Sequence, residues 1–328
     1  MKLVTIHPEH PDPADIAAAV RILRAGGLVA FPTETVYGLG ARGLDPEAVG
    51  RIFRAKGRPR SHPLILHVLG DDEARELAAG WNERADALAR AFWPGPLTLV
   101  VDRAEHVPAE VAGGGTSIAL RAPIHPVARA LIAQLGEPIA APSANRYQTI
   151  SPTAASHVLK SLGDGVDMVL DGGACTGGIE STVVDVRGPR PLVLRPGGVD
   201  LPTLRTVVRD VEMHVPDVAK DAARPSPGMD ARHYAPRGRI LLADGPAHLA
   251  RLAHEHRESP LAVVAHSEEA RPLARHVLPD DPKGYERELF TTLHACDDAN
   301  AQVIIIESPP HDERWLAIHD RLRRAAST

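Results

Sequence analysis

Short apolar runs alternate with amphipathic stretches along most of the chain. The run GGLVAF, residues 26–31, is typical of a buried strand, and DPEAVGRIFRAK, residues 45–56, has the spacing of a helix with one apolar face. Asp45 is expected to be the N-cap of that helix, with Pro46 in its first turn. This alternation predicts an α/β fold.

The same pattern continues to about residue 205. Further strands are expected in seven apolar runs: 64–68, 97–102, 117–123, 138–142, 166–172, 181–186 and 191–197. Helices are expected at residues 82–93, 125–136 and 151–163, the last beginning with a Ser-Pro cap pair.

A change of character near residue 208 predicts two domains and a connecting segment. Residues 208–238 contain several prolines and little periodicity. Alternation of strands and helices then resumes and predicts a small Rossmann-like domain. We therefore expect a first domain at residues 1–207, a linker at 208–238 and a second domain at 239–328.

Composition excludes several classes of protein. The formal net charge of −5 over 328 residues disfavours a broad nucleic-acid-binding face, which is usually basic. Cys175 and Cys296 form no C-x-x-C pair, so no zinc site or disulfide framework is predicted. No apolar run approaches the roughly 20 residues of a membrane helix, and no signal-peptide core is seen. We expect a cytoplasmic protein without membrane contact.

The stretch YGLGARG, residues 37–43, fits the G-x-G-x-x-G pattern of dinucleotide sites, but its surroundings do not. That motif starts directly after a strand and opens a helix, whereas here PTETVY separates the strand from Gly38 and the helix starts only at Asp45. We therefore interpret the glycines as a tightly turning loop beside a ligand.

Polar side chains follow one predicted strand after another. Hydroxyls, amides, imidazoles and basic groups occupy these strand ends or the loops after them, at Thr33, Thr35, Lys56, Arg58, His62, His67, Ser117, Arg121, Ser143, Asn145, Ser151, Ser181 and Arg195. Open α/β sheets bind ligands at such ends, and buried polar groups need partners. Since arginine pairs with carboxylates and phosphates, the pattern predicts one concave site for an anionic ligand.

These segments resemble the Sua5/YrdC/YwlC family of threonylcarbamoyl-AMP synthases, in its two-domain Sua5 type. The resemblance covers nearly the whole chain. It is carried by residues 30–68, WPGPLTLVV, SIALRAPIHP, PIAAPSAN, SPT, GIESTVVDV, LRPG, SPGMDARHYAP and AIHDRLRRAA, in that order. It implies a twisted YrdC-like α/β domain with a large concave cavity, and a linker that forms a lid carrying His233 and Tyr234.

The resemblance also implies a reaction. The family condenses L-threonine, bicarbonate and ATP, with Mg²⁺, into threonylcarbamoyl-AMP and pyrophosphate. A separate tRNA threonylcarbamoyl transferase system then modifies adenosine 37, so this chain need not bind tRNA strongly. The chemistry requires positioning and charge stabilisation and no covalent nucleophile. We therefore predict no Ser-His-Asp unit among the 17 histidines.

Matching positions imply the roles of individual residues. The L-threonine pocket is expected to contain Thr35, His67, Arg121, Ser143 and Ser181, with Arg121 on the carboxylate. The ATP site is expected to contain Lys56, Arg58, His62, Ser117, Asn145, Ser151, Arg195 and Tyr234. Lys56, Arg58 and Arg121 are the expected catalytic residues, and no protein ligand for the Mg²⁺ is predicted.

Two departures from the family pattern stand out. His62 occupies a position where the family usually has Asn, and Arg146-Tyr147-Gln148 replaces a small flexible turn. An imidazole can replace the hydrogen bond of an amide, but its charge changes between about pH 6 and 7.

Two alternative functions remain open from the residues alone. One is a carbamoyl-AMP-forming carbamoyltransferase, whose chains are longer and contain zinc modules that this sequence lacks. The other is a protein that binds nucleotide or double-stranded RNA without turnover, which the acidic net charge disfavours for RNA.

The His62 departure gives a test. We expect His62→Asn to leave activity unchanged at pH 7.5 and to raise it below pH 6.5, where an imidazole in this position gains charge and an amide does not. Initial rates of pyrophosphate release between pH 5.5 and 8 measure the effect. Equal pH profiles for the two proteins would show that this imidazole does not titrate in the working enzyme.

Overall fold

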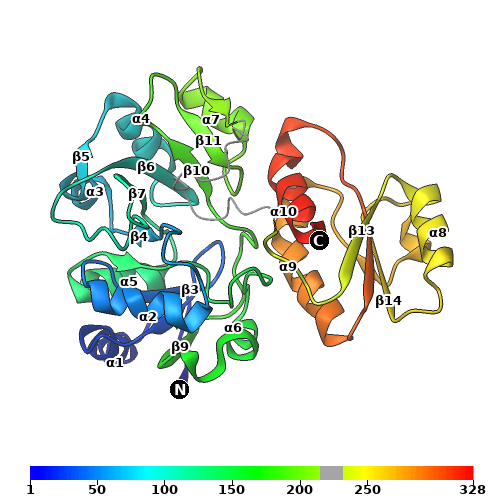
Figure 1. Ribbon diagram of the computed structural model, residues 1–328, viewed down its shortest axis with the longest axis horizontal. Helices are drawn as coiled ribbons and strands as arrows, with labels where there is room; N and C mark the ends of the chain where they lie inside the picture. The colour runs from blue at the N-terminus through cyan, green and yellow to red at the C-terminus, as the bar shows by residue number, and fades with distance from the viewer. Residues whose placement is uncertain (215–231, 328) are drawn as a thin grey trace.

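The computed structural model describes residues 1–214 and 232–327, which form two α/β units placed side by side (Figure 1). The expected linker lies mostly at residues 215–231, outside the described residues, so the lid proposed for that segment is described only from Arg232 onward. None of the described helices has both the length and the hydropathy needed to cross a membrane.

The first unit is built on one long mixed sheet. Its strand order is β1-β9-β2-β3-β8-β4-β7-β6-β10-β11-β12, with β5 paired to β6. The strands are β1 (Lys2–Thr5), β2 (Val29–Phe31), β3 (Gly38–Arg42), β4 (Ile65–His67), β5 (Ala78–Gly80), β6 (Leu97–Arg103), β7 (Ser117–Arg121), β8 (Ile139–Ala140), β9 (Met168–Asp171), β10 (Thr182–Asp185), β11 (Leu192–Arg195) and β12 (Glu212–Met213).

Within the described residues of this unit, seven α-helices lie against the sheet. They are α1 (Pro13–Arg24), α2 (Pro46–Lys56), α3 (Asp71–Leu77), α4 (Glu83–Phe92), α5 (Pro126–Leu135), α6 (Ala155–Leu162) and α7 (Leu201–Val207). Helix α2 begins as expected, because the Asp45 side chain accepts hydrogen bonds from the N–H groups of Glu47 and Ala48. The expected boundary at residue 207 coincides with the end of α7, and β12 follows it on the same sheet.

The Ser-Pro pair at 151–152 does not start helix α6, contrary to the expectation. The helix begins at Ala155, and its N-cap residue Ala154 makes no side-chain cap. The Ser151 hydroxyl is instead a donor to the carboxylate of Glu180. A stronger acceptor inside the protein therefore replaces the local cap.

Most of the glycine stretch forms a strand, so the prediction of a tightly turning loop was wrong for these residues. Gly38–Arg42 form β3, which pairs antiparallel with β2 and β8. None of the three glycines of the motif has a positive φ. A Cβ on Gly40 would lie 2.6 Å from the Phe31 ring, and one on Gly43 would lie 2.7 Å from the carbonyl of Pro138. Close packing between strands, rather than turning, requires glycine here.

The second unit is a four-stranded parallel sheet with helices on it, as the Rossmann-like expectation requires. The strand order is β13-β16-β14-β15, from β13 (Arg239–Ala243), β14 (Leu261–Ala265), β15 (His276–Val277) and β16 (Val303–Glu307). Its helices are α8 (Pro246–Glu255), α9 (Pro282–Asp298) and α10 (Leu316–Ala326). Helices α9 and α10 lie on the side that faces the first unit (Figure 1).

A shared apolar core joins the two units. Val36, Ile150 and Ile179 of the first unit belong to the same buried cluster as Tyr285 and Phe290 of α9. The contact is tight at Gly178, where a Cβ would lie 2.4 Å from the Cα of Arg287. Burying apolar surface on both sides favours a fixed arrangement of the units.

Two stacked histidines also bridge the units. The rings of His157 on α6 and His294 on α9 are parallel to within 18°, with centroids 3.7 Å apart. Burial, followed by the neighbouring His294, lowers the pKa of His157 to about 4, and burial lowers the pKa of His294. Lys160 and Asp298 form an ion pair of 2.5 Å beside the stack. Both rings are therefore neutral at pH 7.

Acidification should destabilise this interface. Because the folded pKa values lie below the ordinary 6.5, the unfolded chain binds more protons between about pH 4 and 6.5, so stability falls as the pH falls. Each extra proton contributes at most about 1.4 kcal/mol per pH unit. We expect a His157→Gln/His294→Gln variant to have a flatter dependence of unfolding free energy on pH in urea titrations from pH 5 to 7.5.

The exposed His106 provides a matched control. His106→Gln should keep the pH dependence of the unmodified protein. If the double variant also kept that dependence, the stack would not be the source of the acid sensitivity.

Candidate active site

One cavity lies where many of the expected site residues meet. It contains all five residues expected for L-threonine, namely Thr35, His67, Arg121, Ser143 and Ser181. From the expected ATP set it contains Arg58, Arg195 and Tyr234. The strand-end pattern in the sequence therefore predicted a real concavity.

Parallel pairing of β4 and β7 sets the two ends of this site. His67 is level with Arg121 at the carboxyl ends of the two strands. Ser117 lies four residues earlier on β7, roughly 13 Å away at about 3.3 Å per residue. At the amino end of β4, Arg58 donates a hydrogen bond to the carbonyl of Pro63 at 3.0 Å. Ser117 and the Pro63 contact of Arg58 therefore both lie at the amino ends of these strands, whereas Arg121 lies at the carboxyl end.

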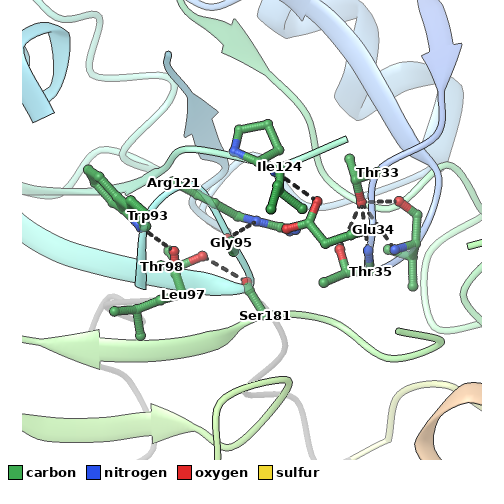
Figure 2. A network of polar contacts seen from close by, with 12 residues as sticks. Thr33, Glu34, Thr35, Trp93, Gly95, Leu97, Thr98, Arg121, Ile124 and Ser181 are labelled. Atoms are coloured by element: carbon green, nitrogen blue, oxygen red, sulfur yellow. Dashed lines mark hydrogen bonds and ion pairs between the residues drawn. The ribbon is translucent and has the colours of Figure 1, made fainter. Parts of the chain in front are cut away.

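Arg121 is held rigidly at its end of the cavity (Figure 2). Its Nη2 pairs with Oε1 of Glu34 at 2.6 Å, and its Nε donates to the carbonyl of Gly95 at 3.3 Å. The side chain is only 4% exposed. No acceptor among the described residues contacts Nη1, so one edge of the guanidinium remains for a ligand carboxylate.

Two threonines beside Arg121 form a directed hydroxyl pair (Figure 2). The Thr33 hydroxyl donates to the carbonyl of Val36 at 2.6 Å and lies 2.8 Å from the Thr35 hydroxyl. Since a hydroxyl has one hydrogen, Thr35 must be the donor in this pair. The lone pairs of Thr35 are then available to accept a hydrogen bond from a ligand N–H or O–H group.

His67 is a neutral group in this site. Burial, and then the nearby charge of Arg121, lower its pKa to about 3. Its Nδ1 is buried and has no partner among the described residues. A buried ring nitrogen without a partner indicates that a ligand completes its hydrogen bonding.

Ser181 connects the cavity to a second arginine. Its hydroxyl lies 2.7 Å from that of Thr98, as Figure 2 shows, and its carbonyl accepts from Nη2 of Arg195 at 2.9 Å. Arg195 is buried, and burial lowers its pKa. These contacts place one cationic group on the cavity wall at the start of β10.

The remaining expected ATP residues are not part of the cavity lining. The positions that do not line it are Lys56, His62, Ser117, Asn145 and Ser151. Lys56 is 3% exposed, and its ammonium donates to the carbonyls of Ser143 and Asn145, both at 2.5 Å. Burial, and then the charge of Arg58, hold the pKa of Lys56 well below its usual range.

The two departures from the family pattern meet in space. The ring of His62 packs edge-on against Tyr147, with centroids 5.5 Å apart. Tyr147 in turn lies 6.3 Å from the ring of His233, which lines the cavity. An aromatic contact therefore joins the two departures, which neither suggests alone.

Residues that sequence reasoning did not assign also belong to the site. Glu34 pairs with Arg121, and Glu180 lines the cavity beside Arg195. Both acids stand inside motifs that carry the hydroxyls, PTET and GIEST, and a buried arginine needs a counter-charge. That requirement was the available signal. Among the described residues, no group of three or more His, Cys, Asp or Glu side chains could hold a metal ion.

Lys56 gives a test of the geometry that does not depend on function. In Lys56→Met, the carbonyls of Ser143 and Asn145 lose their ammonium donor while remaining buried. We expect the free energy of unfolding to fall by about 1–3 kcal/mol, measured in urea. Arg54→Met, on the exposed side of the same helix, should change it by less than about 0.5 kcal/mol. Equal stabilities for the two variants would show that Lys56 does not hold this loop.

The chain is similar to known proteins both in sequence family and in structure. The Sua5_yciO_yrdC family profile, described as telomere recombination, matches residues 21–197. The Sua5_C profile, described as the C-terminal domain of threonylcarbamoyl-AMP synthase, matches residues 199–327.

Individual relatives cover nearly the full chain. A threonylcarbamoyl-AMP synthase of Pyrococcus abyssi is 40% identical over 95% of this chain and 94% of its own. One of Bacillus subtilis is 36% identical over 95% and 92%. The crystal structure of P. abyssi Sua5 complexed with L-threonine superposes with a TM-score of 0.92 at 37% identity, covering 99% of this chain and 98% of the other. The chain therefore belongs to the Sua5/YrdC family, in the form that carries a Sua5 C-terminal domain.

Proposed function

We propose that the chain is an L-threonylcarbamoyladenylate synthase. The observation that carries this proposal is a single cavity with two chemically different ends. One end has Arg121, the Thr35 hydroxyl and the neutral His67, and the cationic groups Arg58 and Arg195 both act on His233 elsewhere in the lining, where burial and then their charges lower its pKa. Such a cavity suits a small amino acid beside a polyphosphate.

Threonine binding would use the fixed groups around Arg121. The carboxylate of the threonine ligand pairs with the unoccupied edge of the Arg121 guanidinium. The amine nitrogen of the ligand donates a hydrogen bond to the Thr35 hydroxyl. His67, with a pKa of about 3, stays uncharged through the working pH range and does not compete for the carboxylate. A pocket for one methyl group gains only about 1–3 kcal/mol, so some serine should be accepted.

The reaction would proceed in two balanced steps. The threonine amine and bicarbonate give the N-carboxylate and one water. An oxygen of that carboxylate attacks the α-phosphorus of ATP, the bond from this phosphorus to the β-phosphate oxygen breaks, and pyrophosphate leaves. Arg58 and Arg195 stabilise the charge on the phosphates, and enclosure of the cavity keeps water from the reactive anhydride.

Mg²⁺ would enter as part of the nucleotide substrate. The described residues include no metal-binding cluster, and the triphosphate itself supplies oxygen ligands of the kind Mg²⁺ prefers. The product would pass to a tRNA threonylcarbamoyl transferase system. A cytoplasmic location and the absence of strong tRNA binding stay predictions.

The decisive experiment tests the dependence of ATP use on both other substrates. We expect the full-length protein, with ATP, Mg²⁺, bicarbonate and L-threonine, to release pyrophosphate and to give a threonylcarbamoyl-AMP peak in mass spectrometry. Omission of threonine or bicarbonate should abolish both signals. Release without threonine would favour carbamoyl transfer, and binding of nucleotide or RNA without any release would favour a binding protein.

Arg121→Lys provides the matched variant for this experiment. Lysine keeps the charge but loses the planar fork and the contact geometry with Glu34. The concentration of threonine needed for half-maximal rate should rise by roughly tenfold or more, while that of ATP stays within about twofold.

A further inference from the structure

The buried guanidinium of Arg321 connects the second unit to the cavity wall. Arg321 lies on α10, the helix that faces the first unit in Figure 1, and it is 1% exposed. Its Nε pairs with Oε2 of Glu180 at 2.8 Å, and its Nη1 pairs with Asp320 at 2.7 Å. A fully buried arginine is costly unless such partners hold it, so the contact fixes α10 against the GIEST segment.

Glu180 links Arg321 to the proposed nucleotide end of the cavity. It lines the cavity, and its second oxygen, Oε1, accepts a hydrogen bond from the Ser151 hydroxyl. Burial opposes ionisation of Glu180, but Arg321, Arg195 and the Ser151 hydroxyl outweigh it and lower the pKa. The carboxylate is therefore charged. One of its oxygens contacts Arg321 of the second unit, and the other contacts Ser151 of the first unit.

Tyr234 receives a second contact from the same side chain. The guanidinium carbon of Arg321 lies 4.8 Å from the centre of the Tyr234 ring, which also packs on Phe290 of α9 at 5.5 Å. Tyr234 lines the cavity with a positive φ of 62° and is 1% exposed, and its hydroxyl has no partner among the described residues. A residue in this strained conformation needs support from its surroundings.

We propose that Arg321 is a positioning residue for the nucleotide, through which the C-terminal domain completes the active site. It does not line the cavity, so it acts through Glu180 and Ser151 on one side and through the Tyr234 ring on the other. The threonine end, at Thr35, His67 and Arg121, lies outside this chain of contacts. The inference rests on the proposed function, because it assigns the affected end of the cavity to ATP.

Binding measurements on the full-length protein test the proposal. Calorimetry with ATP and Mg²⁺ alone, and separately with L-threonine alone, gives two dissociation constants without turnover. Arg321→Met should raise the dissociation constant for ATP by roughly tenfold or more. The dissociation constant for L-threonine should stay within about twofold. A loss that only reflected poor folding would affect both ligands. Arg321→Lys, which keeps the charge, should restore part of the ATP affinity.

Arg323→Met is the matched control on the same helix. Its side chain is 74% exposed, and among the residues that the structure describes it contacts only Asp320. This variant should bind both ligands as the unmodified protein does.

A double-mutant cycle addresses the buried acid. If Arg321→Met leaves Glu180 unpaired and prevents folding, Arg321→Met/Glu180→Gln removes that charge. If both single variants fold, their effects on ATP binding should be non-additive. If Arg321→Met does not fold, the double variant should still bind ATP roughly tenfold or more weakly than the unmodified protein. If Arg321→Met or the double variant folds and binds ATP as tightly as the unmodified protein, the positioning role is refuted. If the unmodified protein binds neither ligand, the proposed function itself is refuted.

Discussion

The structure depends on the burial of positive charge around one cavity. Arg58, Arg121, Arg195 and Lys56 are each less than 8% exposed. Burying such groups costs several kcal/mol each unless partners replace water. The first unit supplies those partners mainly as carbonyls, at Gly95, Pro63, Ser181, Ser143 and Asn145, and as few carboxylates. Because a carbonyl is neutral, the cavity keeps a positive potential for an anionic substrate.

The two carboxylates that do enter the site have distinct places. Glu34 neutralises part of Arg121 at the end where the proposed ligand carries one carboxylate. Glu180 stands between Arg195 and Arg321, where its own charge is offset twice. The site therefore has a nearly balanced end and a cationic end. This gradient distinguishes an amino acid from a polyphosphate before any shape complementarity is considered.

Local sequence patterns predicted the helices and strands, while long-range contacts determine the structural roles of Gly40 and Ser151. The Asp45 cap and the apolar strands are local signals, and the structure confirmed them. The polar strand ends are a local signal too, and part of that set lines the cavity. Gly40 looked like a turn residue but is required by the Phe31 ring on the neighbouring strand. Ser151 looked like a helix cap but bonds to Glu180, 29 positions away. Local patterns in a single sequence do not predict which distant side chain will contact a given residue.

Arg321 shows the same limit at the scale of domains. Nothing in the run RLRRAA distinguishes it from Arg323 or Arg324, because all three are basic residues on one helix. In the fold, Arg321 is buried against Glu180 of the first unit, while Arg323 is exposed to solvent. Its burial then requires an acid from outside the domain, and Glu180 provides one that also faces the cavity. The C-terminal domain is thus tied to the site by electrostatics, because separation of the units would break the buried ion pair between Arg321 and Glu180.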